Sequence, residues 1–281
     1  MPVTRRHHDG PPAGVDVAPD TGHKGWTGTG IAPAEAAAEL HDARRDRRTV
    51  RTFTGRGDDL DLAWAYAVQD AGLALRRADG EQLVGGKLGF TSRAMQRAMG
   101  VAHPNYGWLT DAMLLHEGRV DLGRLIHPKV EPELAFLLGA DVPATAGTAD
   151  VLAATAAVLP CLEVVDSRYD GFRFGPLDNI ADNSSAGGVV LGDPVPVGDR
   201  DLALIGCVLS SDAEVTATAA GAAALDHPAA AVAWMARTAS VPLRAGQVVI
   251  SGGLTAPVDL TAGTAVRAEF GRIGAVELHV T

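Results

Sequence analysis

The sequence predicts an α+β protein in which a mainly helical N-terminal part precedes a body of short strands. Within the first hundred residues, apolar side chains recur at helical spacing. From about Gly107 onward, short β-type runs separated by Gly and Pro replace that spacing. The chain has 281 residues, of which 47% are hydrophobic, so it is long enough to bury a sizeable core.

The first 32 residues differ in composition from the rest of the chain. They are rich in Gly, Pro, Thr and Asp, and Trp26 is almost their only large apolar residue. Such a segment buries too little apolar surface to offset the entropy of ordering it. We therefore predict a disordered tail over residues 1–32 and leave it out of the fold.

Residues 33–106 are predicted to form the helical part. The segment Ala34–Leu40 is rich in Ala and Glu, which favour helix. A second helix is predicted from Asp61, with apolar residues at i, i+3, i+4, i+7 and i+11, and it ends before Gly80. These apolar positions are Trp64, Ala67, Val68, Ala71 and Leu75.

Residues 107–281 are predicted to form the strand-rich body. The expected strands are Glu133–Leu138, Cys161–Val165, Gly188–Leu191, Leu204–Leu209, Gln247–Ser251, Ala265–Phe270 and Ala275–Val280. Two helices are expected between them: Ala149–Val158, capped by Thr148 and closed by Pro160, and Ala229–Ala239, opened by Pro228. The sheet is expected to be mixed or antiparallel.

Charge and composition exclude several classes of protein. With 34 acidic and 24 basic residues, the net charge of -10 argues against nucleic-acid binding. The two cysteines, Cys161 and Cys207, form no Cys-x-x-Cys pair, so neither a zinc ribbon nor a disulfide scaffold is expected. Because no apolar run reaches the roughly 18 residues of a membrane span and the N-terminus lacks an apolar signal core, we expect a cytoplasmic protein.

Three glutamates are the strongest candidates for a metal site. Glu131 and Glu133 are two residues apart, so in a strand both carboxylates lie on one face, and the apolar residues after them indicate a buried strand. Glu163 is a lone glutamate among apolar neighbours, where an unpaired carboxylate is costly. Three carboxylates without His or Cys suit Mg²⁺ or Mn²⁺.

The residues themselves leave an alternative open. Glu131 and Glu133 can lie on an edge strand that faces water, with Glu163 paired to Arg168. A Glu-x-Glu pair is frequent by chance, and the pairing of two distant strands is not readable from sequence.

Three polar segments are candidates for a pocket. Residues 166–169 and 181–188 are polar stretches between apolar strands, so they either line a polar pocket or form turns. Lys87 lies in the glycine-rich segment 85–91, which is not a P-loop because Leu88 follows the lysine. A lysine in this setting can act as a general acid or bind a carboxylate.

Together these motifs resemble a known family. Residues 86–92, 106–113, 127–133, 163–169 and 181–185 are similar, in this order, to the hydratase/decarboxylase branch of the fumarylacetoacetate hydrolase superfamily. The resemblance covers roughly residues 33–281 and implies a mixed β-roll for the body. It also implies a small 2-oxo acid substrate, Mg²⁺ or Mn²⁺ as cofactor, a homo-oligomer and a partner hydratase or decarboxylase.

The resemblance assigns roles to individual residues. It implies a metal on Glu131, Glu133 and Glu163, catalytic roles for Lys87 and Ser185, and substrate binding by Asp111, Ser167, Arg168 and Ser184. In this chemistry the substrate chelates the metal through its carboxylate and keto oxygens, and the metal stabilises an enolate.

Details of the motifs favour a decarboxylase. Hydratases of the family tend to carry Asp at position 105, where this chain has Asn, which cannot act as a carboxylate base. The Glu-Pro-Glu form and residues 172–174 look more like the decarboxylases. We therefore expect decarboxylation of an unsaturated 2-oxo diacid of the 4-oxalocrotonate type. The alternatives are a hydratase of 2-hydroxypenta-2,4-dienoate, a biosynthetic relative with another 2-oxo acid, and a non-catalytic binding or scaffold subunit, which would predict degraded site residues.

Overall fold

The computed structural model describes residue 26 and residues 28–57 and 59–281. Most of the predicted tail, residues 1–32, lies outside these residues, so the tail stays a prediction. Among the described residues, no helix is both long and apolar enough to span a membrane.

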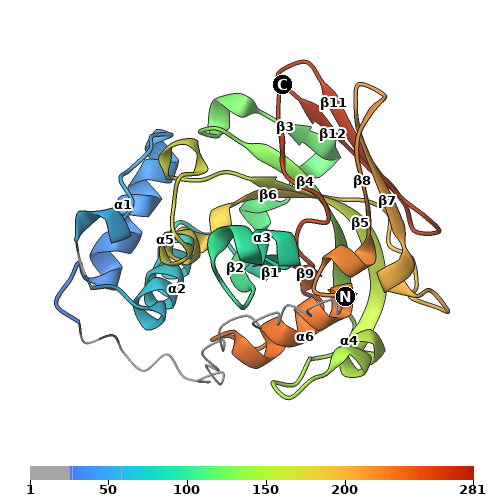
Figure 1. Cartoon of the computed structure of the whole chain (residues 1–281), viewed down its shortest axis with the longest axis horizontal. Helices are drawn as coiled ribbons and strands as arrows, with labels where there is room; N and C mark the ends of the chain where they lie inside the picture. The colour runs from blue at the N-terminus through green and yellow to red at the C-terminus, as the bar shows by residue number, and fades with distance from the viewer. Residues whose placement is uncertain (1–25, 27, 58) are drawn as a thin grey trace, which may run out of the picture.

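Two helices form one side of the molecule, shown in blue in Figure 1. The first, α1, spans Pro33–Asp46, and α2 spans Leu62–Ala78 and packs against it. The α2 helix begins where the sequence predicts, because the side chain of Asp61 accepts a hydrogen bond from the backbone N–H of Trp64 at 2.7 Å. Its apolar face, including the fully buried Trp64 and Val68, lies in the main core.

A seven-stranded mixed sheet forms the centre of the molecule. Its strands are β1 (Leu83–Gly89), β2 (Asn105–Thr110), β4 (Lys129–Leu138), β5 (Thr155–Val165), β6 (Ala186–Leu191), β9 (Val248–Ile250) and β10 (Val258–Asp259). The order is β2-β1-β9-β4-β5-β6, with β10 also paired to β4. Only the β1–β9 pair is parallel in this sheet. The neighbours of β4 and β5 make both of them interior strands.

A second, five-stranded sheet packs against β5 and β6 on the other side of the molecule (Figure 1). Its strands are β3 (Arg119–Val120), β7 (Gly206–Ser211), β8 (Glu214–Ala220), β11 (Ala265–Phe270) and β12 (Gly274–Val280). In β11 every second residue is buried, which is the alternation expected of a sheet with one face in the core. The predicted α+β class with a mixed β-roll body is confirmed.

Four shorter helices complete the fold: α3 (Arg93–Met99), α4 (Thr148–Ala154), α5 (Pro176–Ala181) and α6 (Pro228–Thr238). The α5 helix packs on α2, and α6 packs on α4 and β1. The predicted helix opened by Pro228 is confirmed to within one residue.

Two predictions of secondary structure were wrong. The helix expected over Ala149–Val158 ends at Ala154, and β5 then runs from Thr155 through Pro160 instead of beginning at Cys161. Pairing with β4 and β6 decides this conformation, since Val158 lies opposite Phe136 and the Pro160 carbonyl accepts from Gly192 N.

The part expected to be mainly helical, residues 33–106, also contains β1 and the start of β2. The glycines of β1 have weak strand preference, so the strand depends on pairing with β2 and β9. The predicted boundary at residue 106, between a helical part and a strand-rich body, stays a prediction.

Candidate metal centre

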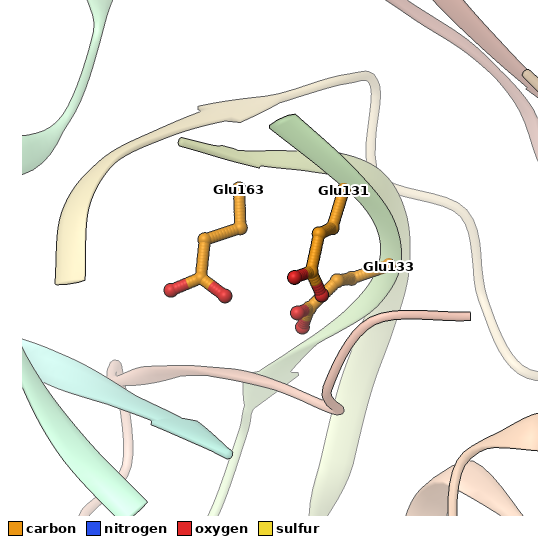
Figure 2. A group of neighbouring side chains, drawn as sticks. All are labelled: Glu131, Glu133 and Glu163. Carbon is orange, nitrogen blue, oxygen red and sulfur yellow. The ribbon is translucent and has the colours of Figure 1, made fainter. Parts of the chain in front are cut away.

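The pairing of β4 with β5 brings the three predicted glutamates together. Glu131 lies directly opposite Glu163 in the register of the two strands, and Glu133 follows two residues later on the same face of β4. Figure 2 shows the three carboxylates converging on one space. One carboxylate oxygen from each lies within 4.8 Å of the others. We call these residues the glutamate cluster.

Burial makes this cluster electrostatically unfavourable without a cation. Glu133 and Glu163 are almost fully buried, and Glu131 is half-buried. Burial, and then the charge of Glu163, raise the pKa of Glu131 to about 7 and the pKa of Glu133 well above its usual range. The pKa of Glu163 is also raised by burial, although Lys87 partly offsets the shift. Three such carboxylates stay ionised together only beside added positive charge.

The backbone after β9 closes the cluster from the opposite side. Gly252 N donates a 2.7 Å hydrogen bond to Glu133 Oε2, while Glu133 Oε1 is buried without a donor among the described residues. A Cβ at Gly253 would come within 1.7 Å of Glu131 Oε2, so any larger residue would displace the Glu131 carboxylate from this position. The orphaned oxygen and the oxygen-only ligand set fit a hard divalent cation. Sequence reasoning missed these glycines, although a Gly-Gly pair directly after a predicted strand is a signal of close backbone approach.

Lys87 contacts the cluster from β1. Its Nζ atom lies 3.1 Å from Glu163 Oε1 and donates to the Ser184 carbonyl oxygen at 2.8 Å. Burial by itself would lower the pKa of Lys87, but the charges of Glu163 and Glu133 outweigh it and raise the pKa above its usual value. Lys87 is therefore a buried ammonium group at the edge of the cluster.

These contacts exclude the alternative that the sequence left open. The ion-pair partner of Glu163 is Lys87 rather than Arg168, and β4 is an interior strand rather than an edge strand. The predicted grouping of the three glutamates with Lys87 is present in the structure.

Ser184 and Ser185 lie in a tight turn, η6 (Asn183–Ser185), in which all three residues have positive φ angles of 51° to 58°. The predicted turn and the predicted pocket lining are both present. A hydrogen-bonded chain links the two serines: Ser184 Oγ donates to Asn105 Oδ1, Asn105 Nδ2 to Asn179 Oδ1, and Asn179 Nδ2 to Ser185 Oγ. The three residues with strained backbone conformations therefore lie next to Lys87, which donates to the Ser184 carbonyl oxygen.

Three residues expected to bind substrate have other contacts. Asp111 is exposed and accepts hydrogen bonds from the backbone N–H groups of Gln82 and Ala112. Arg168 forms a buried ion pair with Asp182, and Ser167 Oγ donates to the same carboxylate. Asp111, Ser167 and Arg168 do not line the cavity beside the cluster, and their expected role in substrate binding stays a prediction.

That cavity, which we call the pocket, has a volume of about 220 Å³. Glu131, Lys87, Ser184 and Ser185 lie in its wall, together with Asn179. Apolar side chains make up another part of the wall, among them Met95, Met99, Val165, Phe172 and Phe174. The aromatic residues and methionines were not among the predicted site residues, although residues 172–174 did count among the features that resemble the decarboxylases.

Comparison with known proteins identifies the family. The model of the fumarylacetoacetate (FAA) hydrolase C-terminal family matches residues 92–281, which include the whole glutamate cluster. The chain belongs to the fumarylacetoacetate hydrolase family. Relatives with known activities then show to which branch of the family the chain belongs.

Two curated relatives are hydratases. A 2-hydroxypent-2,4-dienoate hydratase of Pseudomonas putida is 42% identical over 208 residues, which are 73% of this chain and 94% of the relative. A 2-keto-4-pentenoate hydratase of Burkholderia vietnamiensis is 38% identical over 254 residues, 88% of this chain and 97% of the relative.

A similar solved structure is that of a decarboxylase. The 4-oxalocrotonate decarboxylase from Pseudomonas putida G7, complexed with magnesium and adipate, has a TM-score of 0.85 at 32% identity. The match covers 89% of this chain and 97% of the decarboxylase. The chain is therefore an enzyme of the hydratase/decarboxylase branch of the family.

Proposed function

We propose that this chain is a metal-dependent decarboxylase of a small unsaturated 2-oxo diacid of the 4-oxalocrotonate type. The observation that carries the proposal is the composition of the pocket. It joins the glutamate cluster to an apolar wall, and among its described lining residues Glu131 is the only carboxylate. A ligand of the metal is a poor base, so the pocket suits loss of CO₂ better than activation of water.

The proposed metal is Mg²⁺ or Mn²⁺ held by Glu131, Glu133 and Glu163. The magnesium in the solved decarboxylase and the orphaned oxygen of Glu133 support this assignment. When bound, the ion supplies a Lewis acid that favours negative charge on the 2-oxo oxygen of the substrate.

The reaction on 2-oxohex-3-enedioate breaks the bond between the distal carboxyl carbon and the adjacent methylene. The electron pair moves through the conjugated chain to the 2-oxo oxygen, CO₂ leaves, and one proton is added to give 2-hydroxypenta-2,4-dienoate. Lys87 is the proposed proton donor, because its Nζ atom carries protons in the pocket wall beside the glutamate cluster. Ser185, oriented through Asn179, is proposed to donate its hydroxyl hydrogen to a substrate oxygen.

The apolar wall has a part in the same scheme. A leaving carboxylate loses its charge as it becomes CO₂, so surroundings that solvate the carboxylate poorly favour the reaction. Phe172 and Phe174 are among the large apolar side chains that line the pocket.

A hydratase is the second candidate, because the two curated relatives described above are hydratases. Addition of water needs a group that takes its proton. Asn105 lies at the position where hydratases tend to carry Asp. Its amide bonds Ser184 and Asn179 in the hydrogen-bonded chain described above, and it has no carboxylate to accept a proton.

The assembled cluster and Lys87 argue against a non-catalytic scaffold subunit.

The test is an ultraviolet assay of the full chain with 2-oxohex-3-enedioate and Mg²⁺, run in parallel with 2-hydroxypenta-2,4-dienoate and repeated with EDTA. We expect CO₂ release from the diacid that stops with EDTA. Metal-dependent consumption of the dienoate without reaction of the diacid would identify a hydratase instead. Reaction of neither compound would overturn the proposed function.

The proposed reaction also concerns partners. Its product is the substrate of a dienoate hydratase, so we propose that such a hydratase acts next. We also propose that both enzymes act in the cytoplasm. The family resemblance further implies a homo-oligomer. Light scattering of the purified chain, alone and with a hydratase, measures both associations.

A further inference from the structure

Strand β4 presents three charged residues on one face. Lys129, Glu131 and Glu133 alternate along the strand, so their side chains point to the same side of the sheet. Lys129 and Glu131 both lie in the wall of the pocket. Two residues of extended strand span roughly 6–7 Å. The pocket therefore has a positive charge at a fixed distance from the metal ligands.

The surroundings of Lys129 favour a negatively charged ligand group. Its Nζ atom lies 5.6 Å from the centroid of the Phe172 ring, which is also part of the pocket wall. A second carboxylate of a bound substrate would be costly beside this apolar wall without a cation. Lys87 and Lys129 are the only cationic side chains among the described lining residues, and Lys87 already pairs with Glu163.

An exposed aspartate forms an ion pair with Lys129. Asp259 Oδ1 lies 2.5 Å from Lys129 Nζ, because Asp259 is directly opposite Lys129 in the β10–β4 register. The Asp259 side chain is 81% exposed, whereas that of Lys129 is 26% exposed. An exposed ion pair contributes little free energy, so water readily replaces Lys129 as the partner of Asp259.

We propose that Lys129 binds the distal carboxylate of the substrate, in competition with Asp259, and so makes the pocket selective for dicarboxylic over monocarboxylic 2-oxo acids. This inference rests on the proposed function and specifies its substrate class. It gives Lys129 a role in binding the diacid rather than in the loss of CO₂. Its contact stabilises the carboxylate before the reaction and disappears when CO₂ leaves, whereas the apolar wall acts on the reaction itself. No motif predicted this role, because it depends on the pocket that β4 and Phe172 form together.

The test compares two unreactive ligands that differ only in the distal group, 2-oxoadipate and 2-oxohexanoate. Neither has the double bond through which the electrons of decarboxylation would move. Isothermal titration calorimetry with Mg²⁺ measures the affinity ratio of the diacid to the monoacid for the unmodified protein, K129M and D259N. The matched controls are R244M and D141N, which break an exposed ion pair of 2.6 Å beyond the other end of β4.

We expect K129M to lower the affinity for 2-oxoadipate about tenfold, as for loss of one charge-assisted contact, and to leave that for 2-oxohexanoate unchanged. D259N should raise the ratio, because it removes the competitor, and the two controls should leave it unchanged.

A ratio that both K129M and D259N leave unchanged, while both ligands bind, overturns this inference alone. Absence of Mg²⁺-dependent binding of either ligand to the unmodified protein overturns the proposed function, and the inference with it.

Discussion

Three glutamates and one lysine place net negative charge in a single buried space. The ammonium group of Lys87 lies 3.1 Å from Glu163, and it is the one positive charge that the described chain supplies within the cluster. One cation among three carboxylates leaves an imbalance that a divalent metal corrects. This charge balance depends on single ionised groups, so substitutions that keep the size of a side chain and remove its charge test it.

Replacement of Lys87 by Met is expected to lower kcat by about a hundredfold or more, because the proposed proton donor is lost. The half-saturating Mg²⁺ concentration should change much less, since Met removes no metal ligand. Steady-state kinetics at varied Mg²⁺ measure both quantities. A kcat for K87M equal to that of the unmodified enzyme would remove Lys87 from the mechanism.

The raised pKa of Glu131 predicts how the stability of the metal-free protein depends on pH. This pKa is about 7 in the folded protein, against an ordinary value of 4.5. Between these two values the folded state binds more protons than the unfolded state, so stability decreases as the pH rises from about 4.5 through 7. Thermal unfolding in EDTA from pH 5 to 8 should show this decrease. E131Q should make it smaller, and a slope that E131Q leaves unchanged would contradict the assignment.

At the scale of elements, two loops hold the ends of the cluster. The residues after β9 approach Glu131 and Glu133, and the η6 turn holds Ser184 against Lys87. Neither loop carries a residue of the glutamate cluster. Each loop acts by placing backbone atoms beside side chains that come from the central sheet.

The close approach of Gly253 predicts the effect of one added methyl group. G253A should displace the Glu131 carboxylate and weaken Mg²⁺ binding at least about tenfold, because the new Cβ overlaps Oε2. The control is G72A, a helical glycine in α2 whose added Cβ meets nothing within 4 Å; it should stabilise the protein by up to about 1 kcal/mol. Calorimetric titration with Mg²⁺ measures the affinity. Equal Mg²⁺ affinity in both variants would contradict the predicted displacement.

The Arg168–Asp182 ion pair anchors the η6 turn from outside the pocket. Asp182 accepts from Arg168 and Ser167, and its backbone carbonyl accepts from Arg168 Nη2 at 2.7 Å. D182N leaves Arg168 buried without its counter-ion, which should cost about 3 kcal/mol of unfolding free energy in urea. The exposed pair Asp199–Arg272 is the control, and D199N should change stability by less than about 1 kcal/mol. If D182N were as mild as D199N, the turn would not depend on this pair.

For the whole molecule, metal binding is linked to folding, because the cluster exists only when β4 and β5 are paired. Mg²⁺ at about a hundred times its Kd should add about 2.7 kcal/mol to the free energy of unfolding and raise Tm. E163Q should abolish this gain together with turnover. E214Q, at an exposed position of β8, should keep both. Differential scanning fluorimetry with and without EDTA measures the shift, and an equal gain in E163Q would contradict the metal site.

Much of the molecule follows from local sequence. Helical spacing from Asp61 onward predicted α2, a short β-type run predicted β11, and the glutamates beside apolar residues predicted which side chains need a cation. These features are local because a helix turn, a strand face and the cost of a buried carboxylate each depend on neighbouring residues.

Only the tertiary structure decided the rest. Pro160 and the glycines of β1 have little preference for strand, and pairing on both sides imposes the strand conformation on them. Asp111, Ser167 and Arg168 have the residue types of a binding site, but their partners are backbone groups and Asp182. Gly253 joins the site because β9 pairs with β4, which lies more than a hundred residues away along the chain. Lys129 is part of β4, but the pocket that it faces also needs Phe172 from a distant segment. Contacts over such separations come from the packing of the whole chain, and a single sequence does not contain them locally.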